Sequence, residues 1–245
     1  CLRPAAVGQH CVDCVAEAAR STPQARTIAG APARSAKTTP IVTYTLIALN
    51  VLVFLVTAAQ SGSVMNNERS SPLFLDWALW PPAIAANGDY IRILGSGFLH
   101  FGLMHLAINM FALWIIGRDT ELVLGRARYL SVYVISILGG SAAVMLLQTG
   151  AVTAGASGAV FGLLGAQAVI LMRLRRSPAP VLAVVALNVV ISITIPGISL
   201  WGHLGGLVAG AAATAALLYG PQSLRAGNDR ARATRTGWVA LGAVA

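Results

Sequence analysis

Six polar residues stand out inside long apolar stretches of this sequence, where a polar group is costly unless it has a role. They are His100, His105, Asn109, Ser157, Asn188 and His203. A serine hydroxyl becomes a good nucleophile when a neighbouring base takes its proton, and histidine is the usual base. Ser157 and His203 are the pair placed for this chemistry, so the sequence predicts a Ser–His dyad. The stretches contain no Asp or Glu, so the prediction does not extend to a triad.

Attack of a serine on a peptide carbonyl also requires hydrogen-bond donors for the oxyanion that forms. Asn109 offers a side-chain amide, and His105 offers an imidazole one turn earlier on the same helical face. The backbone N–H of Ser157 is expected at a helix N-terminus, where the helix dipole favours negative charge. Gly155 and Gly158 would allow a close backbone approach at that point. The sequence therefore predicts an oxyanion site beside the dyad.

The glycines around the serine and the histidine also have a purely structural interpretation. Their four-residue spacing is typical of membrane helices that pack closely. The glycines in question are Gly158 and Gly162 in one stretch, and Gly202, Gly206 and Gly210 in the other. For Ser157 taken alone, helix packing is the simpler hypothesis. The two interpretations agree, because close contact between these stretches would bring Ser157 beside His203.

The composition predicts a membrane protein. Of 245 residues, 56% are hydrophobic and only 10% are charged, outside the usual range of soluble domains. A helix needs about 20 apolar residues to cross a bilayer, and six continuous stretches approach that length. They cover residues 41–60, 94–116, 129–149, 156–172, 179–195 and 200–219. Because the runs are continuous rather than alternating, we expect an all-α fold with six transmembrane helices and not a barrel.

The net charge of +9 is a topology signal. All of the 17 basic residues except Arg69 and Arg92 fall in the terminal segments or in the second and fourth connections between spans. The positive-inside rule then places both ends in the cytoplasm. The expected partner of this charge is the lipid bilayer and not nucleic acid. In this topology the four proposed site residues lie in the outer half of the membrane, open to external water.

The regions outside the core are predicted to be cytoplasmic. Residues 1–40 begin with Cys1, Cys11 and Cys14, which resemble part of a zinc ribbon, and continue over 15–40 as a flexible linker. Residues 220–245 form a basic tail that ends in what resembles the start of a seventh helix. No secretory signal peptide is predicted. Within the core 41–219 the sequence predicts neither a metal site nor a cofactor for catalysis, and it lacks the H-E-x-x-H motif of metalloproteases.

Three motifs in order resemble the rhomboid family of intramembrane serine proteases. HFGLMHLAINM at 100–110 is similar to the family's H-x4-H-x3-N motif, GASG at 155–158 to its G-x-S-G, and GHLGGLVAG at 202–210 to its last core helix. The stretch 117–130 is similar to the family sequence that follows the second helix. Two departures are Ile91 before Arg92, where tryptophan is frequent, and Gly202 before His203, where alanine is common.

The resemblance implies a role for each matching residue. It implies Ser157 as nucleophile, His203 as general base and acid, Asn109 and His105 as oxyanion donors, and His100 as a structural residue that holds the first external loop. Gly155, Gly158, Gly202 and Gly206 are implied as supporting positions. The cysteine-bearing N-terminus is similar to the zinc-ribbon extension of some actinobacterial members, so a bacterial cell membrane is the expected location.

The implied activity is cleavage of transmembrane or juxtamembrane segments of other membrane proteins. The fourth span is short, which would leave Ser157 below the outer surface under a water-filled recess. One alternative stays open: the same glycine faces would also support a non-catalytic protein that binds or escorts membrane clients. A small-solute transporter is less consistent with the sequence, because the spans lack charged residues and paired broken helices.

Overall fold

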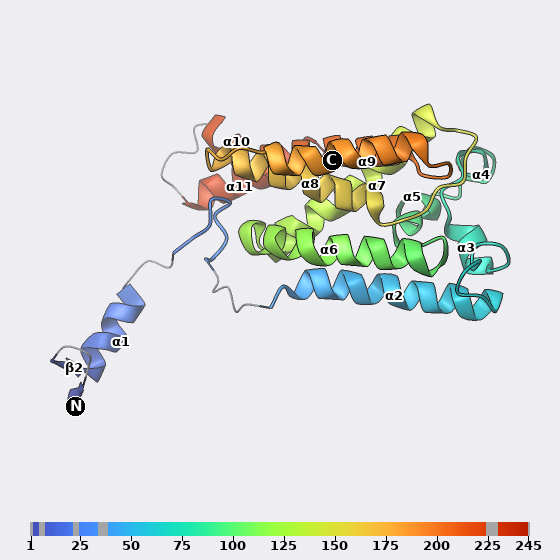
Figure 1. The fold of residues 1–245 in the computed structure, drawn as a ribbon. Helices are drawn as coiled ribbons and strands as arrows, with labels where there is room; N and C mark the ends of the chain where they lie inside the picture. Colours follow the sequence, from blue (N-terminus) through green and yellow to red (C-terminus); the bar gives the residue numbers. More distant parts are fainter. Residues whose placement is uncertain (1, 5–7, 22–24, 34–38, 224–229, 245) are drawn as a thin grey trace.

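The computed structural model describes residues 2–4, 8–21, 25–33, 39–223 and 230–244. Long helices dominate these residues and lie roughly along one direction (Figure 1). Those that correspond to the predicted spans are α2 (Ile41–Ser61), α6 (Gly102–Leu124), α7 (Arg126–Leu147), α8 (Ser157–Arg173), α9 (Ala179–Thr194) and α10 (Leu200–Ser223). The predicted all-α membrane architecture is confirmed.

Shorter elements flank these helices. Between α2 and α6 the chain gathers at one end of the bundle (Figure 1), whereas β1 and β2 pair as an antiparallel hairpin near the N-terminus. These elements are β1 (Leu2–Pro4), β2 (Gln9–Cys11), α1 (Val12–Ser21), α3 (Pro72–Trp77), α4 (Pro81–Asn87), α5 (Ile91–Gly95), the 3-10 helix η1 (Ser96–Phe98) and α11 (Arg230–Gly242).

The lengths of the helices test the predicted number of spans. Among the described residues, α2, α7 and α10 are long and apolar enough to cross a membrane, and a fourth crossing results when α5 and η1 are counted with α6. Helices α8 and α9 are apolar but have 17 and 16 residues, fewer than the ~20 that a perpendicular crossing needs. The chain is a multi-pass membrane protein, and the number six stays a prediction.

The second span differs from its prediction at both ends. The expected stretch 94–116 is broken, because α5 and η1 meet α6 at an angle of 86°. At the bend Gly102 has φ +72°, and a β-carbon there would stand 2.8 Å from the Met65 carbonyl oxygen. Only glycine fits this turn without strain. Hydrophobicity alone did not reveal the break, because the residues on both sides of it are apolar.

At its other end α6 continues to Leu124, and Gly125 alone separates it from α7. The basic residues of the predicted connection therefore lie within helices: Arg118 in α6, and Arg126 and Arg128 in α7. The helix continues because Glu121 is buried against the start of α2. Its carboxylate accepts the backbone N–H groups of Val42 at 3.1 Å and Thr43 at 2.8 Å.

Close contact between α8 and α10 forms the centre of the bundle. A β-carbon at Gly206 would overlap the carbonyl oxygen of Gly158, and one at Gly210 would overlap the backbone of Gly162. These two pairs stack along one line of contact, so the two backbones approach as closely as glycine permits. The contact also holds the first turns of α8 and α10 side by side, and these turns carry Ser157 and His203.

The segment between α2 and α6 is anchored by Arg92. The guanidinium is buried and donates to the carbonyl oxygens of Leu75 at 2.6 Å and Ala78 at 3.0 Å. Its Nε also pairs with the Asp89 carboxylate at 3.3 Å. Arg92 therefore holds α3, the segment after it and α5 together.

A second anchor, Asn67, connects this segment to the start of α6. Its amide nitrogen donates to Thr57 Oγ1 at 2.8 Å and to the His100 carbonyl at 3.0 Å. Its amide oxygen accepts the N–H of Gly102 at 2.8 Å. The side chain is fully buried, so these bonds replace the water that the amide would otherwise bind.

The flanking regions are more ordered than the sequence indicates. Within the predicted flexible linker 15–40, α1 extends to Ser21, and residues 25–33 pack on the junction of α6 and α7. There Ala29 is buried, Thr27 Oγ1 donates to the Val123 carbonyl at 2.7 Å, and the Arg128 guanidinium donates to the Ala29 carbonyl. The linker prediction is wrong for these described residues. The segment docks because Ala29 is buried at the junction and because backbone carbonyls on both sides accept side-chain hydrogen bonds.

The C-terminal region contains one more helix, and a seventh membrane span there stays a prediction. Helix α11 has 13 residues, too few to cross a bilayer, and packs along α10. Leu241 is buried, and a β-carbon at Gly220 would lie 2.7 Å from that of Ala240. The Trp238 ring faces the Arg128 guanidinium at 6.0 Å, so α11 and residues 25–33 both meet the same basic side chain.

Candidate active site

Ser157 is the first residue of α8, and the chain enters this helix through Gly155. Gly155 has φ +136° and donates its N–H to the Ser96 carbonyl at 2.9 Å. A β-carbon at this position would stand 2.9 Å from Cε1 of His105. Glycine is required here both by the backbone conformation and by the neighbouring ring, and this turn places the serine hydroxyl at the open end of the helix.

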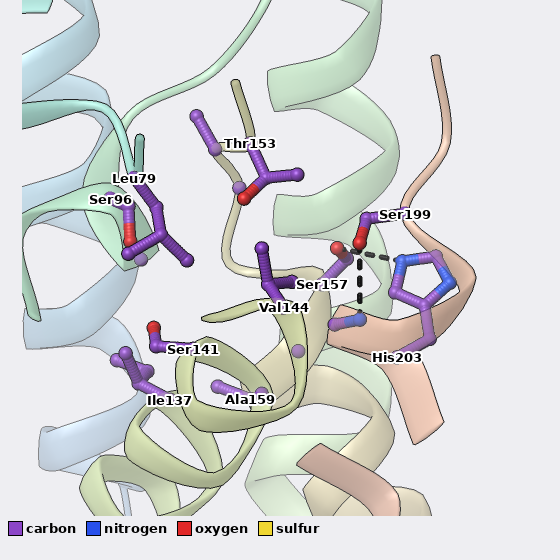
Figure 2. Close-up of a pocket in the computed structure, with 16 residues that line it drawn as sticks. Leu79, Ser96, Ile137, Ser141, Val144, Thr153, Ser157, Ala159, Ser199 and His203 are labelled. Carbon is purple, nitrogen blue, oxygen red and sulfur yellow. Dashed lines mark hydrogen bonds between the residues drawn. The ribbon is translucent and has the colours of Figure 1, made fainter. Parts of the chain in front are cut away.

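The hydroxyl of Ser157 lies in hydrogen-bond contact with His203. Their Oγ and Nε2 atoms are 2.8 Å apart, and Figure 2 shows the imidazole of α10 directed at the serine of α8. His203 is only 8% exposed, in the first turns of α10. The pair that the sequence predicts is brought together at the distance that proton transfer requires.

The ring of Phe161 holds the imidazole of His203 from one face. The two rings stack with centroids 4.2 Å apart and planes 8° from parallel. Phe161 follows Ser157 by one turn of α8, so the helix that carries the nucleophile also limits the rotation of the base. This contact was not predicted from the sequence, although the position of Phe161 four residues after Ser157 was an available signal.

His105 lies on the other side of the serine. Its Nδ1 accepts the backbone N–H of Phe101 at 3.2 Å, so in the neutral ring the proton is on Nε2. A β-carbon at Gly155 would stand 3.0 Å from this Nε2 and 3.5 Å from Ser157 Oγ. An N–H donor is therefore present close to the nucleophile.

Asn109 lies one turn further along α6 and is buried. Its amide nitrogen donates to the His105 carbonyl at 2.9 Å, which leaves its second N–H free for another acceptor. The backbone N–H groups of Ser157, Gly158 and Ala159 begin α8 without a side-chain cap, so they too are donors without an intrahelical partner. The start of α8 and the nearby His105 Nε2–H thus supply donors beside Ser157, and the place of Asn109 in an oxyanion site stays a prediction.

His100 is fully buried beneath His105, with the rings edge to face at 5.2 Å. Its carbonyl accepts from Asn67, which anchors the segment between α2 and α6. The residue therefore lies where the chain bends into α6 and supports the neighbouring imidazole. This placement agrees with the structural role that the resemblance implies.

A cavity of about 390 Å³, including its open mouth, lies beside the dyad. The residues of α7 and the loops that face it are mostly small (Figure 2). Its lining includes Gly97, Gly140, Ser141, Thr153, Gly155, Ser157, Gly158, Ser199, Gly202 and His203, but not His105 or Asn109. The cavity can accept a small side chain next to the serine hydroxyl.

A family model described as the Rhomboid domain matches residues 87–220. That range contains Ser157, His203, His105 and Asn109, and it covers more than half of the chain. The chain belongs to the rhomboid family. The resemblance seen in the three motifs is confirmed.

Several named rhomboid proteases align with the chain. The rhomboid protease GluP of Bacillus subtilis is 33% identical over 183 residues, which are 73% of this chain and 35% of that protein. The putative rhomboid protease YdcA of the same organism is 30% identical and is covered over 85% of its length. The rhomboid protease AarA of Providencia stuartii is 26% identical, with 75% of it covered. The chain spans about a third of GluP and about half of RHOMBOID-like protein 6 of Arabidopsis thaliana.

The rhomboid domain also holds a serine that sequence analysis missed. Ser192 of α9 lies 2.9 Å from Nδ1 of His203, on the side of the ring away from Ser157. The amide of Asn188 donates to the Val184 carbonyl at 2.9 Å within α9. Ser192 follows Asn188 by four residues in an apolar run, and its polarity was the signal that could have indicated it.

The N-terminal cysteines are the predicted zinc ligands. Cys1 lies outside the described residues, and Cys11 and Cys14 carry free thiols. Hydrogen bonds from the backbone of Cys14 and Asp13 lower the pKa of the Cys11 thiol, which favours the thiolate that zinc binds. Within the part of the chain that the structure describes, no three His, Cys, Asp or Glu side chains gather as ligands. A zinc site stays a prediction, which the zinc content of the intact protein would test.

Proposed function

We propose that this rhomboid protein is an intramembrane serine endopeptidase that cleaves transmembrane or juxtamembrane segments of other membrane proteins. The observation that carries the proposal is the 2.8 Å contact between Ser157 Oγ and His203 Nε2. A half-buried hydroxyl and a buried imidazole at this distance, beside a cavity and a helix N-terminus, meet the geometric requirements of acyl transfer. The names of the aligned relatives support the same chemistry.

In the proposed reaction Oγ of Ser157 attacks a peptide carbonyl while His203 Nε2 takes the hydroxyl proton. The tetrahedral oxyanion forms near the start of α8, where His105 Nε2–H, the free N–H of Asn109 and the Ser157 backbone N–H can stabilise it. Collapse breaks the C–N bond, and His203 returns the proton to the leaving amine. A water molecule then attacks the acyl-enzyme with His203 as base, releasing the acid and restoring the serine.

The cavity indicates what part of a substrate meets the serine. Because the larger side chains of Leu79, Ile137 and Val144 also line the cavity and restrict it, we expect a small side chain on the residue that supplies the carbonyl. An intact α-helix hides its carbonyls in its own hydrogen bonds, so the substrate must be extended at the cleavage site. Helix-weakening residues near that site are therefore expected.

The proposed setting is a cell membrane with both chain ends in the cytoplasm and the dyad toward the outside. Its support is the distribution of basic residues along the sequence, because all but Arg69 and Arg92 fall in the terminal segments or in two alternate connections between the predicted spans. The escort alternative gives no account of why the hydroxyl and the imidazole are aligned. It becomes the better hypothesis only if the dyad does no chemistry.

The test is labelling of the detergent-purified protein with a fluorophosphonate probe, together with cleavage of a single-span reporter protein. Wild type should label and cleave, whereas Ser157→Ala should do neither and His203→Ala should be reduced in both. A matched control is Ser131→Ala, which removes an exposed hydroxyl on α7. Equal labelling of wild type and Ser157→Ala, with no reporter cleavage, would overturn the protease proposal and favour the escort hypothesis.

A further inference from the structure

The base of the proposed dyad has a hydrogen-bond partner on each ring nitrogen. Nε2 of His203 faces Ser157 at 2.8 Å, and Nδ1 faces Ser192 Oγ at 2.9 Å. Ser192 is only 7% exposed and comes from α9, a helix whose other buried residue is Val185. A buried hydroxyl thus occupies the position where a triad would place a carboxylate.

The direction of these hydrogen bonds follows from a third contact. Ser192 Oγ lies 2.7 Å from the Asn188 carbonyl oxygen, and a carbonyl can only accept. The single hydroxyl proton of Ser192 is therefore donated to Asn188, which leaves Oγ as an acceptor toward His203. Nδ1 must then carry the ring proton, and Nε2 keeps the lone pair that accepts the proton of Ser157.

We propose that Ser192 is a positioning residue that selects the reactive tautomer of His203 and orients its ring toward Ser157. This inference rests on the proposed function only for its catalytic consequence, since the hydrogen-bond order is a property of the resting protein. When His203 takes the proton of Ser157 it becomes an imidazolium, and the Nδ1–H bond to Ser192 then stabilises a positive charge. A hydrogen bond to a charged group is stronger than one between neutral groups, so Ser192 favours the charged state of the reaction over the resting state.

The chain supplies a conservative variant and a matched control. Ser192→Ala removes the acceptor, whereas Ser192→Thr keeps a hydroxyl that can bond to the same carbonyl and the same ring. Thr194→Ala removes a hydroxyl from the same helix that also donates to a carbonyl four residues earlier, Val190 at 2.9 Å. Thr194 is exposed and has no contact with the dyad.

The first experiment measures kcat and KM on a single-span reporter, with fluorophosphonate labelling rates alongside. Ser192→Ala should lower kcat and the labelling rate about 10- to 100-fold, the range of one hydrogen bond to a charged group, with KM little changed. Ser192→Thr should recover most of the rate, and Thr194→Ala should match wild type. A Ser192→Ala protein that is folded and reacts at the wild-type rate would overturn the proposal.

The second experiment does not depend on activity. Nitrogen NMR of protein labelled in its four histidines, assigned with His203→Ala and recorded at about pH 8 where an ordinary histidine is neutral, reports which nitrogen carries the proton. Wild-type His203 should carry it on Nδ1, and Ser192→Ala should lose this preference. If the ring proton of His203 in the wild-type protein lies on Nε2, the proposal is overturned, even if the variants fail to fold. If wild type shows the Nδ1 proton but neither labels nor cleaves, the protease proposal fails while the assignment to Ser192 stands.

Discussion

Gly206 of α10 lies against the carbonyl oxygen of Gly158 in α8, with no room for a β-carbon between them. Gly158 follows Ser157, and Gly206 is three residues after His203. The distance between nucleophile and base is therefore set by a contact between two backbones, which is stiffer than one between flexible side chains.

This contact predicts that Gly206→Ala separates α8 from α10. The added methyl group has no space, and overpacking of this kind typically costs about 1–3 kcal/mol. We expect a lower melting temperature in detergent and a larger loss of fluorophosphonate labelling, because the dyad needs a separation near 2.8 Å. Gly150→Ala is the control, since nothing lies within 4 Å of a β-carbon there. Full labelling by Gly206→Ala would show that the contact does not position the dyad.

The oxyanion assignment predicts that Asn109→Ala slows turnover while the protein stays folded. Removal of one oxyanion donor costs about 2.7–4 kcal/mol in a soluble serine protease, so kcat should fall about 100- to 1000-fold on the reporter. Asn188→Ala is a matched control, because its exposed amide makes the same bond to a carbonyl four residues earlier. Unchanged kcat in Asn109→Ala would remove this residue from the site.

The anchor at Arg92 predicts that Arg92→Ala loosens the segment between α2 and α6. The change leaves the carbonyls of Leu75 and Ala78 without their donor, and each hydrogen bond to a charged group is worth roughly 1.5–3 kcal/mol. Hydrogen exchange over residues 72–95 should become faster than in wild type, and proteolytic cleavage in the same segment should increase. Arg69→Ala, which removes an arginine with a 76% exposed side chain, should leave both measurements unchanged. Equal protection from hydrogen exchange in Arg92→Ala and Arg69→Ala would contradict the role of Arg92 as an anchor.

The buried carboxylate of Glu121 predicts a large loss of stability in Glu121→Ala. It accepts three hydrogen bonds at the start of α2, two from backbone N–H groups and one from Thr43 Oγ1 at 2.9 Å. The charge also lies at a helix N-terminus, where the dipole favours it. The change leaves two backbone N–H groups and a hydroxyl without their acceptor, so we expect a loss of at least about 1.5–3 kcal/mol, the range for one hydrogen bond to a charged group, measured by thermal or denaturant unfolding in detergent. The exposed Asp119→Asn change on the same helix should cost less than about 0.5 kcal/mol.

The membrane class, the dyad residues and the family could be predicted from the sequence, because each depends on local patterns. Hydrophobic runs indicate helices, and a polar residue inside such a run stands out by its cost. The ends of α6 could not be predicted in this way. The break at Gly102 depends on the carbonyl of Met65, and the continuation through Glu121 depends on Val42 and Thr43, all of which are distant in sequence.

The contact made by Ser192 is a feature of the site that the sequence could not predict. Nothing in the residues around position 192 indicates that its hydroxyl meets an imidazole eleven residues later, since the contact requires α9 and α10 to pack in one particular rotation. The sequence by itself determined which groups could do chemistry, because the type of each side chain sets its protons and lone pairs. Only the tertiary structure decided which nitrogen of His203 holds the proton and which accepts it, because that choice depends on hydrogen bonds between different helices.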